Sequence, residues 1–505
     1  MKKKLAMLLT AAMLVDFTTM DPMDTSDTLS GGIQRLMMDG LFGFDDDMKI
    51  IPMLATDYEA NDDATEFTIH LREGIQFSDG TPWNAEAAKA NFDRWGDKNL
   101  GLKRTTLLCN VLKETEIVDD YTVKVTLENP FGAFIPTLAH PACVVMSPAV
   151  IAKGNEECAK NPVGTGQYTF VEWVAGEHAT IALNKDWWGY NADICGGTAL
   201  VDPDAGFKTI TFKPVSENAT RVAMLQSGDA QFIWPVPTES IETLRGDSNV
   251  AVGQEEGIVV RYLMMNNQKA PFNDVRVRQA INYAINKDAY CAVVKNGVAT
   301  PATSIIGPNV QFYKGNDVYA YDIEKAKSLL AEAGYPDGFT MSLYIGSTTY
   351  REKMAQMLQY YWSQIGVTLD IKSSTMADWS AAVVDSWQSD VVNSYGVSWN
   401  SDPDPYGFLG KFFSSQTLHA SSNAGGYNDP EMDELLNEGF GSTDNAKRAE
   451  SYKKVIEKVM NEYTGIYYAY ECRNWAVSPK VHDAVLRADN QMLVATPFNN
   501  IWIEE

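Results

Sequence analysis

One segment of the chain carries closely spaced carboxylates that could bind a divalent cation. Asp402, Asp404 and Gly407 fall at positions 1, 3 and 6 of a calcium-loop pattern. Position 5 of that pattern is Tyr406, however, and position 12, where a bidentate glutamate completes a calcium shell, is Phe413. The segment therefore predicts no calcium site, and its aspartates remain candidates for other polar contacts.

Other residue types with catalytic or metal chemistry are few and scattered. Gly164-Thr165-Gly166 begins like a dinucleotide fingerprint, but Thr169 stands where its last glycine belongs. The chain has no P-loop, no H-E-x-x-H and no G-x-S-x-G motif. The five histidines never approach metal-ligand spacing: they are His70, His140, His178, His419 and His482. We therefore predict no metal, no cofactor and no catalytic residue.

The carboxylates and the cysteines leave alternatives open. The 66 acidic residues are compatible with a glycosidase-type carboxylate pair, which keeps a secreted hydrolase as an alternative. The six cysteines contain no C-x-x-C pair, and they fit either buried free thiols or one or two disulfides.

Charge and hydropathy exclude several classes of protein. The 505 residues include 41 Lys and Arg against 66 Asp and Glu, a net charge of −25. Nucleic-acid binding and docking on an anionic membrane need clustered cations, so we expect neither partner. No run of about 18 apolar residues marks a membrane span. The length and the 45% hydrophobic content fit roughly two to four globular domains.

The N-terminus predicts export. Lys2, Lys3 and Lys4 precede an apolar stretch at residues 5–15, which is typical of the front of a signal peptide. Residues 16–20 supply neither a small-residue cleavage site nor a cysteine for lipidation. We therefore interpret residues 1–15 as the remnant of a signal peptide, truncated or wrongly joined, from a parent lipoprotein that is exported to the periplasm or the cell surface.

Alternating strand and helix patterns run through the chain. Apolar residues alternate at residues 67–71 and 122–127, which predicts half-buried strands. Asn84 can cap a helix that reaches Trp95, and Asp322 can cap one that ends at Gly334. Residues 339–371 give strand, helix and strand, the unit that builds parallel sheets. The fold class is predicted as α/β.

Four longer segments carry distinctive motifs. The segments are residues 71–86 (LREGIQFSDGTPWNAE), 161–168 (NPVGTGQY), 275–288 (VRVRQAINYAINKD) and 426–433 (GYNDPEMD). They resemble, in the same order, the signatures of bacterial extracellular solute-binding proteins of family 5, the receptors of peptide and nickel ABC importers. Their Pro, Gly and capping residues also suit a scaffold of turns and helix starts, so we assign them to the fold rather than to a site.

The resemblance implies a periplasmic-binding-protein-like fold of the type II, large three-lobed class. Lobe I would comprise residues 16–40, 162–257 and 473–505. Lobe II, residues 41–161, would be an insertion, and lobe III would be residues 258–472. Lobes I and III would close on a ligand cleft by a hinge motion. The implied protein is a monomeric receptor that binds a small molecule or peptide and delivers it to an ABC permease without catalysis.

The resemblance also implies a ligand site. In peptide-binding relatives an aspartate three residues after a tryptophan holds the peptide's ammonium group, and Asp402 has that place after Trp399. A carboxylate in a dry cleft is a strong partner for a cation. The other candidates are Tyr395, Ser398, Asn400, Ser401 and Trp234. Structural alternatives are a turn cap for Asp402 before Pro403, and core packing for Trp399 and Trp234.

The same resemblance shapes the expected ligand. Dipeptide-binding members carry an arginine in the loop before the helix that starts near Tyr350, but residues 346–349 read GSTT. Oligopeptides are therefore expected rather than dipeptides. An oligosaccharide or a metal chelate remains an alternative ligand. Family members also have a first strand just before the segment at residues 18–22, and here that strand is expected to be missing.

Overall fold

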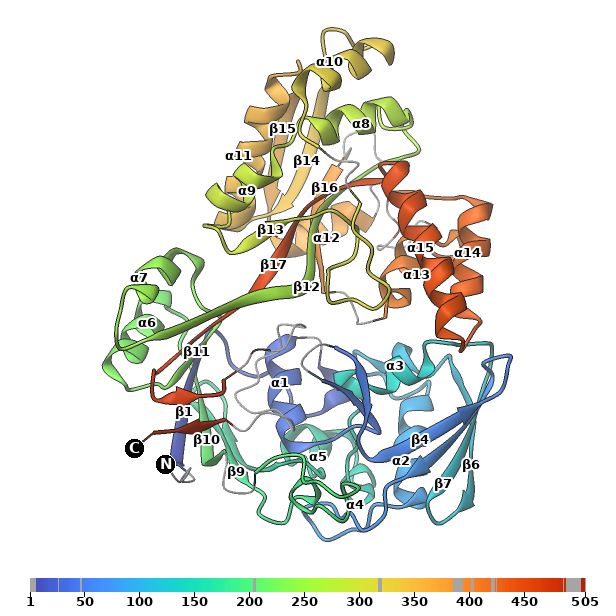
Figure 1. The fold of residues 1–505 in the computed structure, drawn as a ribbon, viewed down its shortest axis with the longest axis vertical. Coiled ribbons are helices and arrows are strands. Elements are labelled where there is room, and N and C mark those ends of the chain that lie inside the picture. The colour runs from blue at the N-terminus through green and yellow to red at the C-terminus, as the bar shows by residue number, and fades with distance from the viewer. Residues whose placement is uncertain are drawn as a thin grey trace. The chain divides into compact units, whose positions relative to one another are not determined.

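The computed structural model divides the chain into two compact units (Figure 1). Unit 1 comprises residues 1–255, 441–443 and 473–505, and unit 2 comprises residues 256–440 and 444–472. The structure describes residues 6–25, 27–45, 48–202, 206–316, 320–384, 394–400, 404–418, 423, 425–484, 486 and 501–504. Within these ranges no helix is long and apolar enough to cross a membrane.

The larger sheet of unit 1 forms around its N-terminal strand. β1 (Ala6–Met13) runs parallel to β10 (Phe207–Pro214) on one side and to β11 (Phe232–Trp234) on the other. Antiparallel β9 (His178–Leu183) and β8 (Tyr168–Val174) extend the sheet beyond β10. A β1 flanked on both sides is an interior strand, with no backbone edge open to solvent.

β1 corrects two predictions about the N-terminus. Residues 6–13 form a paired strand in the sheet rather than a signal-peptide segment, and the lobe I sheet does not lack this strand. Leu9, Ala11 and Met13 are buried in the core of unit 1. The signal-peptide prediction was wrong for a physical reason: a signal peptide and a parallel strand buried on both faces both need a short apolar run.

A second sheet and its helix complete the N-terminal half of unit 1. The antiparallel strands are, in spatial order, β4 (Ala55–Ala60), β5 (Glu66–Leu71), β7 (Thr122–Leu127) and β6 (Leu112–Asp119). α2 (Ala85–Gly96) packs against β6 and β7 (Figure 1). The helix begins at Ala85 because the Asn84 side chain accepts a hydrogen bond from the Ala87 N–H at 3.0 Å.

Shorter elements fill the rest of unit 1. They are α1 (Thr28–Met37), β2 (Phe42–Phe44), β3 (Ile50–Pro52), α3 (Phe134–Leu138), α4 (Pro148–Ile151), α5 (Asn155–Lys160), α6 (Asn218–Ser227), α7 (Ile241–Arg245), β18 (Val481–His482) and β19 (Trp502–Ile503). α1 supplies Ile33, Leu36 and Met37 to the same buried core as β1. This core joins the N-terminal segment to strands from residue 168 onward.

The sheet of unit 2 has parallel strands at its outer side. β14 (Thr340–Gly346) lies between β15 (Thr368–Ser374) and β16 (Ser394–Asn400), and it runs parallel to both. β16 pairs antiparallel with β12 (Ala251–Met265), which is followed in the sheet by β17 (Gly465–Val477). β13 (Ala299–Pro301) pairs with β17 off this path. β12 and β17 are the two strands whose other ends belong to unit 1.

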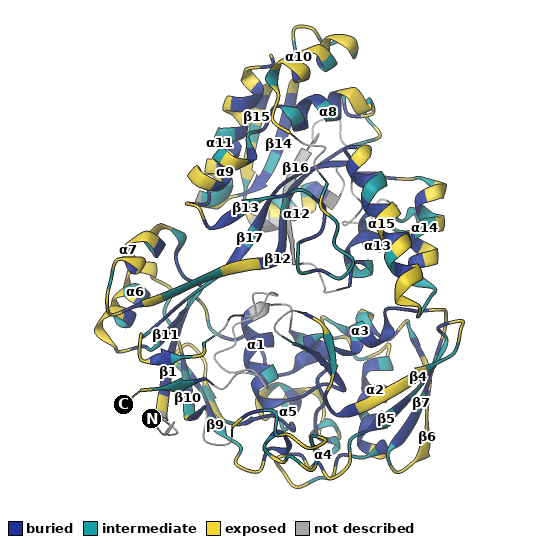
Figure 2. Ribbon diagram, in the orientation of Figure 1, coloured by how far each residue is buried: buried dark blue, intermediate teal, exposed yellow. Residues whose placement is uncertain are grey.

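Most of β12 in unit 2 is buried, as the dark blue of Figure 2 shows, and helices pack on both of its faces. One group shares a core with Leu263 and Met265: α8 (Val275–Tyr283), α9 (Lys287–Val293), α10 (Ile323–Glu332) and α11 (Thr349–Ser363). Tyr262, the intervening residue, contacts Phe408 and Phe412 of α13 (Tyr406–Phe413). The remaining helices are α12 (Met376–Val384), α14 (Pro430–Phe440) and α15 (Asn445–Asn461). A strand buried on both faces explains the nearly unbroken apolar run of β12.

The local predictions for unit 2 are confirmed. Asp322 caps α10 by accepting a hydrogen bond from the Lys325 N–H at 2.9 Å, and Gly334 follows the helix with a φ of +92°. The strand–helix–strand unit is β14, α11 and β15, with the two strands parallel. The α/β fold class is also confirmed.

Candidate ligand-binding site

The carboxyl ends of three parallel strands meet at one edge of the unit 2 sheet. β14, β15 and β16 end there at Gly346, Ser374 and Asn400, and α11 begins at Thr349, close after β14. Open α/β sheets bind ligands outside the carboxyl ends of their strands. We call this region the carboxyl edge of unit 2 and treat it as the candidate site.

Four of the residues proposed from the sequence lie on β16. Its register with β12 sets Asn400 opposite Val259, Trp399 opposite Val260, Ser398 opposite Arg261 and Tyr395 opposite Met264. Ser398, Trp399 and Asn400 are therefore at the carboxyl edge, whereas Tyr395 is nearer the other end of the strand. Ser401 and Asp402 lie outside the described residues, so their roles remain predictions.

Asp404, the first described residue after Asp402, is firmly anchored. Asp404 is buried, and its Oδ2 accepts from Nη2 of Arg448 on α15 at 2.5 Å. Its Oδ1 accepts the N–H of Tyr406 at 3.0 Å, in the first turn of α13. Burial lowers the pKa of Arg448, but Asp404 outweighs burial and raises it above its ordinary value. The described residues on either side of Asp402 are therefore both paired, Asn400 through β12 and Asp404 through Arg448.

A group of charged side chains adjoins the same edge, and sequence reasoning missed it. Arg261 Nε lies 2.8 Å from Glu471 Oε1, and Lys295 Nζ lies 2.5 Å from the same oxygen. Both cations also contact the Tyr350 ring, with centroid distances of 5.2 Å for Arg261 and 4.5 Å for Lys295. We call Arg261, Lys295, Glu471 and Tyr350 the cationic cluster. It holds two cations for one carboxylate.

Tyrosine hydroxyls extend the cluster into the core of unit 2. Tyr290 donates to the Tyr350 hydroxyl at 2.7 Å, and the Tyr350 and Tyr468 hydroxyls lie 3.3 Å apart. Burial raises the pKa of Tyr290 and Tyr468 well above the ordinary value, so both stay neutral. The tyrosines fix the Tyr350 ring and add no charge of their own.

Burial and neighbouring charges set the protonation of the cluster. Burial alone would raise the pKa of Glu471, but Arg261 and Lys295 outweigh it and hold that pKa well below its usual range. Burial would lower the pKa of Arg261, yet Glu471 raises it. Burial, and then repulsion by Arg261, lower the pKa of Arg351 in the first turn of α11. Arg261 and Glu471 therefore both carry their charge at neutral pH, and the positive field of Arg261 reaches Arg351.

The sequence contains a signal for this cluster. Arg261 interrupts the apolar stretch of β12, and Glu471 interrupts a similar stretch of β17. Charged residues are seldom placed in buried strands unless they pair. Two such interruptions in neighbouring strands indicate a pair, although they cannot reveal Lys295 or Tyr350, which come from elsewhere in the chain.

Trp234, the remaining sequence candidate, belongs to unit 1. It ends β11, is partly buried and packs against the core that contains β1. Core packing is the structural alternative that the sequence analysis gave for Trp234. A ligand-binding role for Trp234 remains a prediction.

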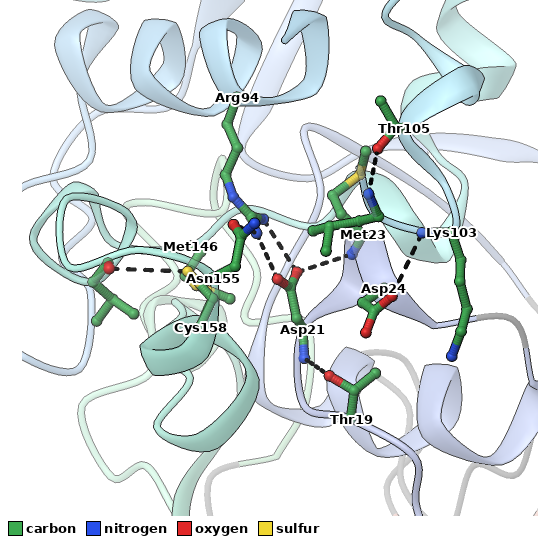
Figure 3. A network of polar contacts seen from close by, with 12 residues as sticks. Thr19, Asp21, Met23, Asp24, Arg94, Lys103, Thr105, Met146, Asn155 and Cys158 are labelled. Carbon is green, nitrogen blue, oxygen red and sulfur yellow. Dashed lines mark hydrogen bonds and ion pairs between the residues drawn. The ribbon is translucent and has the colours of Figure 1, made fainter. Parts of the chain in front are cut away.

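Unit 1 has a different buried ion pair, drawn in Figure 3. Asp21 accepts from Arg94 of α2 through both carboxylate oxygens, at 3.1 and 2.5 Å, and from the Met23 N–H at 3.0 Å. Asn155 accepts a further hydrogen bond from Arg94 at 3.2 Å. One cation here meets one carboxylate, and the pair joins the segment around Asp21 to α2. We assign it to the fold.

Neither a metal centre nor a disulfide is found in the described ranges. No group of three or more His, Cys, Asp or Glu side chains there could hold a metal ion. Each of the six cysteines, all of which are described, is a free thiol. Of the two alternatives for the cysteines, the structure therefore shows free thiols.

Comparison with known proteins points to one family. The model of bacterial extracellular solute-binding proteins, family 5 middle, matches residues 49–419. Glutathione-binding protein GsiB of Escherichia coli O1:K1 is 36% identical over 451 residues, covering 88% of this chain and 86% of that protein.

Two solved structures share the fold. HbpA2 from Haemophilus parasuis has a TM-score of 0.86 at 25% identity, covering 99% of this chain and 100% of that one. The periplasmic binding protein DppA from Helicobacter pylori, in complex with the peptide STSA, has a TM-score of 0.79 at 26% identity, covering 100% and 99%. The resemblance that the four sequence segments indicated is therefore confirmed, as is the type II periplasmic-binding-protein fold. This chain belongs to the bacterial extracellular solute-binding proteins of family 5.

Proposed function

We propose that this protein is the extracytoplasmic receptor of an ABC importer and that it captures peptides for a membrane permease. The observation that carries the proposal is the carboxyl edge of unit 2, where β16 leads into the segment with Asp402 and the cationic cluster adjoins it. A region with a carboxylate and an excess of cations suits a ligand with both an ammonium and a carboxylate group. Peptides are such ligands.

In this proposal Asp402 binds the peptide's ammonium group. A charge-assisted hydrogen bond in a water-poor site is strong and directional. The Arg448–Asp404 ion pair fixes Asp404, the first described residue after Asp402, to α15. Trp399, Asn400, Ser401, Ser398 and Tyr395 would form the surroundings of the ammonium group.

Two peptide classes are candidates. Oligopeptides follow from the loop at residues 346–349, which has no arginine to hold the carboxylate of a dipeptide. Short peptides of the size of glutathione follow from the name of GsiB and from Arg261, Lys295 and Arg351, which supply cations that the loop itself lacks. The second candidate rests on contacts in the structure, and we favour it.

Transport requires a partner and a motion. We propose that ligand binding favours a closed form, with bending where the chain passes between the units at residues 255–256 and 472–473. The closed monomer would then dock on the permease outside the cytoplasm, and the ligand would be released unchanged. Small-angle scattering with and without peptide, together with hydrogen exchange at these two crossings, would measure the closure.

The substitution Asp402→Asn tests the site. It keeps the size and removes the charge, so affinity for a peptide should fall by roughly 2–5 kcal/mol because the ammonium group stays buried and unpaired. N-acetylation of the peptide should cost the wild type as much and the variant little more, since both changes remove one interaction. Calorimetry with glutathione and with a tripeptide and a pentapeptide measures these losses. Asp370→Asn, an exposed carboxylate that pairs with Lys372 at 2.8 Å, is the control and should leave affinity unchanged.

Other outcomes would favour the alternatives. If Asp402→Asn lowers the melting temperature and leaves affinity intact, Asp402 is a turn cap. Equal binding of acetylated and free peptides would move the oligosaccharide or metal chelate ahead. Steady release of hydrolysis products from a bound ligand would support the secreted hydrolase.

A further inference from the structure

We propose that Glu255 and Arg473 form an ionic clamp between β12 and β17, so that the two strands bend as one ribbon where they pass between the units. Glu255 is the residue of β12 at which unit 1 ends, and Arg473 is the residue of β17 at which unit 1 resumes. The clamp itself is independent of the ligand. Its consequence for closure rests on the proposed function.

The ion pair is the first argument. Oε2 of Glu255 accepts from Nη2 of Arg473, so the contact joins two neighbouring strands of one sheet. The Arg473 side chain is only 9% exposed, whereas the Glu255 side chain is 51% exposed. Nη1 of Arg473 also donates to the backbone carbonyl of Leu486. A nearly buried guanidinium needs a countercharge, so the pair holds the unit 1 end of β12 against β17.

A packing contact on the same two strands supports the clamp. Trp475 lies against Gly253, where a Cβ would overlap the indole ring. Residues two apart on a strand point to the same face, so the ion pair and this contact share one face of the ribbon. Trp475 also packs against the core that contains β1, and the end of β17 pairs with β11. β17 is therefore fixed in unit 1, and the clamp fastens β12 to it.

The points at which the two strands pass between the units lie side by side. Three contacts give the register: Gly253 with Trp475, Glu255 with Arg473, and Leu263 with Gly465. The residue numbers rise along β12 as they fall along β17, so the strands run antiparallel and residues 255–256 lie opposite residues 472–473. Two strands that are joined at the same level bend together about one axis, whereas separate strands can bend and twist independently.

Hydrogen exchange of the full-length protein without ligand tests the clamp. Glu255→Gln keeps the size of the side chain and removes its charge, so Arg473 loses its countercharge. Residues 250–258 and 469–476 should then exchange about 5- to 30-fold faster than in the wild type, the range expected when one partly buried ion pair is lost. The increase should appear in both strands, because the clamp joins them.

A double-mutant cycle separates the clamp from two independent contributions to stability. Arg473→Gln removes the other half of the pair, and the double variant removes both halves. If the two side chains act through each other, the double variant should exchange at most about threefold faster than the faster single variant, whereas independent effects would multiply. Raising the salt concentration to about 1 M should speed exchange in the wild type more than in these variants, because the half-exposed Glu255 is open to screening.

Glu256→Gln is the matched control. Glu256 is the next carboxylate of β12, is exposed and points to the other face of the strand, so its loss should leave exchange unchanged. Equal acceleration by Glu255→Gln and Glu256→Gln, or acceleration in β12 alone, would overturn the inference. Acceleration that extends to β1 and β10 would indicate general unfolding and would also overturn it.

Scattering with and without glutathione tests the consequence for closure. The wild type should become more compact with this ligand, and Glu255→Gln should show a broader range of sizes in both states, because its strands bend independently. A wild type that clamps its strands in the exchange experiment but does not become more compact with any peptide would contradict the proposed closure and leave the clamp standing.

Discussion

The two units each bury an ion cluster, and the two clusters differ in charge balance. In unit 1, Asp21 and Arg94 form a one-to-one pair with side chains that are 1% and 7% exposed, and Asn155 and the Met23 N–H complete the contacts (Figure 3). In unit 2, two cations divide one oxygen of Glu471 and keep between 11% and 19% of each side chain exposed.

The difference suggests what each cluster is for. A balanced and sealed pair gains nothing from a further ion, because every strong acceptor already has its donor. A cluster with an excess cation and some remaining exposure is incomplete without a mobile anion. Under the proposed function, we expect charge balance to separate a buried pair that serves the fold from one that serves a ligand. The arrangement of strands alone does not make this distinction.

The largest effect expected from this comparison is on stability in unit 1. Asp21→Asn leaves Arg94 buried without a countercharge, which should destabilise the protein by about 3–5 kcal/mol. Chemical unfolding followed by tryptophan fluorescence measures this loss. Peptide affinity at temperatures where the variant is folded should equal that of the wild type.

Two results would break the assignment of Asp21 to the fold. A loss of peptide affinity in the folded variant would place the pair in the binding machinery. A loss of stability below about 1 kcal/mol would mean that the pair behaves like an exposed one. The variant Asp21→Glu, which keeps the charge, should recover part of the stability.

The response to pH should also differ between the units. In unit 2, Glu471 has a lowered pKa, so its stabilising effect is full above the unfolded value of about 4.3 and is lost as pH falls below it. In unit 1, burial raises the pKa of Asp39 despite donors from Trp188, Trp187 and Thr165. Its contribution is full below the unfolded value of about 3.9 and is lost as pH rises through the folded pKa.

Melting curves between pH 3 and pH 7 for Glu471→Gln and Asp39→Asn measure these slopes. The deficit of Glu471→Gln relative to the wild type should shrink toward acid pH, since the wild type loses its own advantage there. The stability of Asp39→Asn relative to the wild type should rise toward neutral pH. Slopes of the same sign for both variants would contradict the contrast between the two carboxylates.

The sequence predicted the local elements and the family well, for a physical reason. Caps such as Asn84 and Asp322 and the strand–helix–strand unit at residues 339–371 depend on neighbours in the chain, and the structure confirms them. The apolar run at residues 5–15 was wrongly predicted to be a signal peptide, because burial in a sheet and recognition as a signal peptide both require apolar residues.

The candidate site was harder to predict, because its charges come from distant segments. Two sheet strands and the turn that follows α9 bring together Arg261, Lys295 and Glu471. The spacing of these residues in the sequence gives no sign that they are in contact. Asp402 came from family resemblance alone and lies outside the described residues. The neighbouring Asp404, which the sequence offered only as a failed calcium ligand, proves to be the partner of Arg448.

The smallest expected effect uses the same helix as the largest one. Lys89 of α2 contacts both carboxylate oxygens of Asp93 at 2.7 and 2.9 Å, which resembles the contact of Arg94 with Asp21. The Lys89 and Asp93 side chains are 37% and 57% exposed, however, so water already solvates both charges. Lys89→Met, which keeps the length of the stem, should destabilise the protein by only about 0.2–0.5 kcal/mol.

Raising the salt concentration to about 1 M should abolish even this difference, because the Debye length then falls to about 3 Å. The loss in Asp21→Asn should persist at that salt concentration, since a sealed pair is poorly screened. A comparable loss from Lys89→Met would mean that contact between the ions, and not their burial, determines how much a pair stabilises the fold. The charge balance of buried clusters would then be no guide to the ligand site in unit 2.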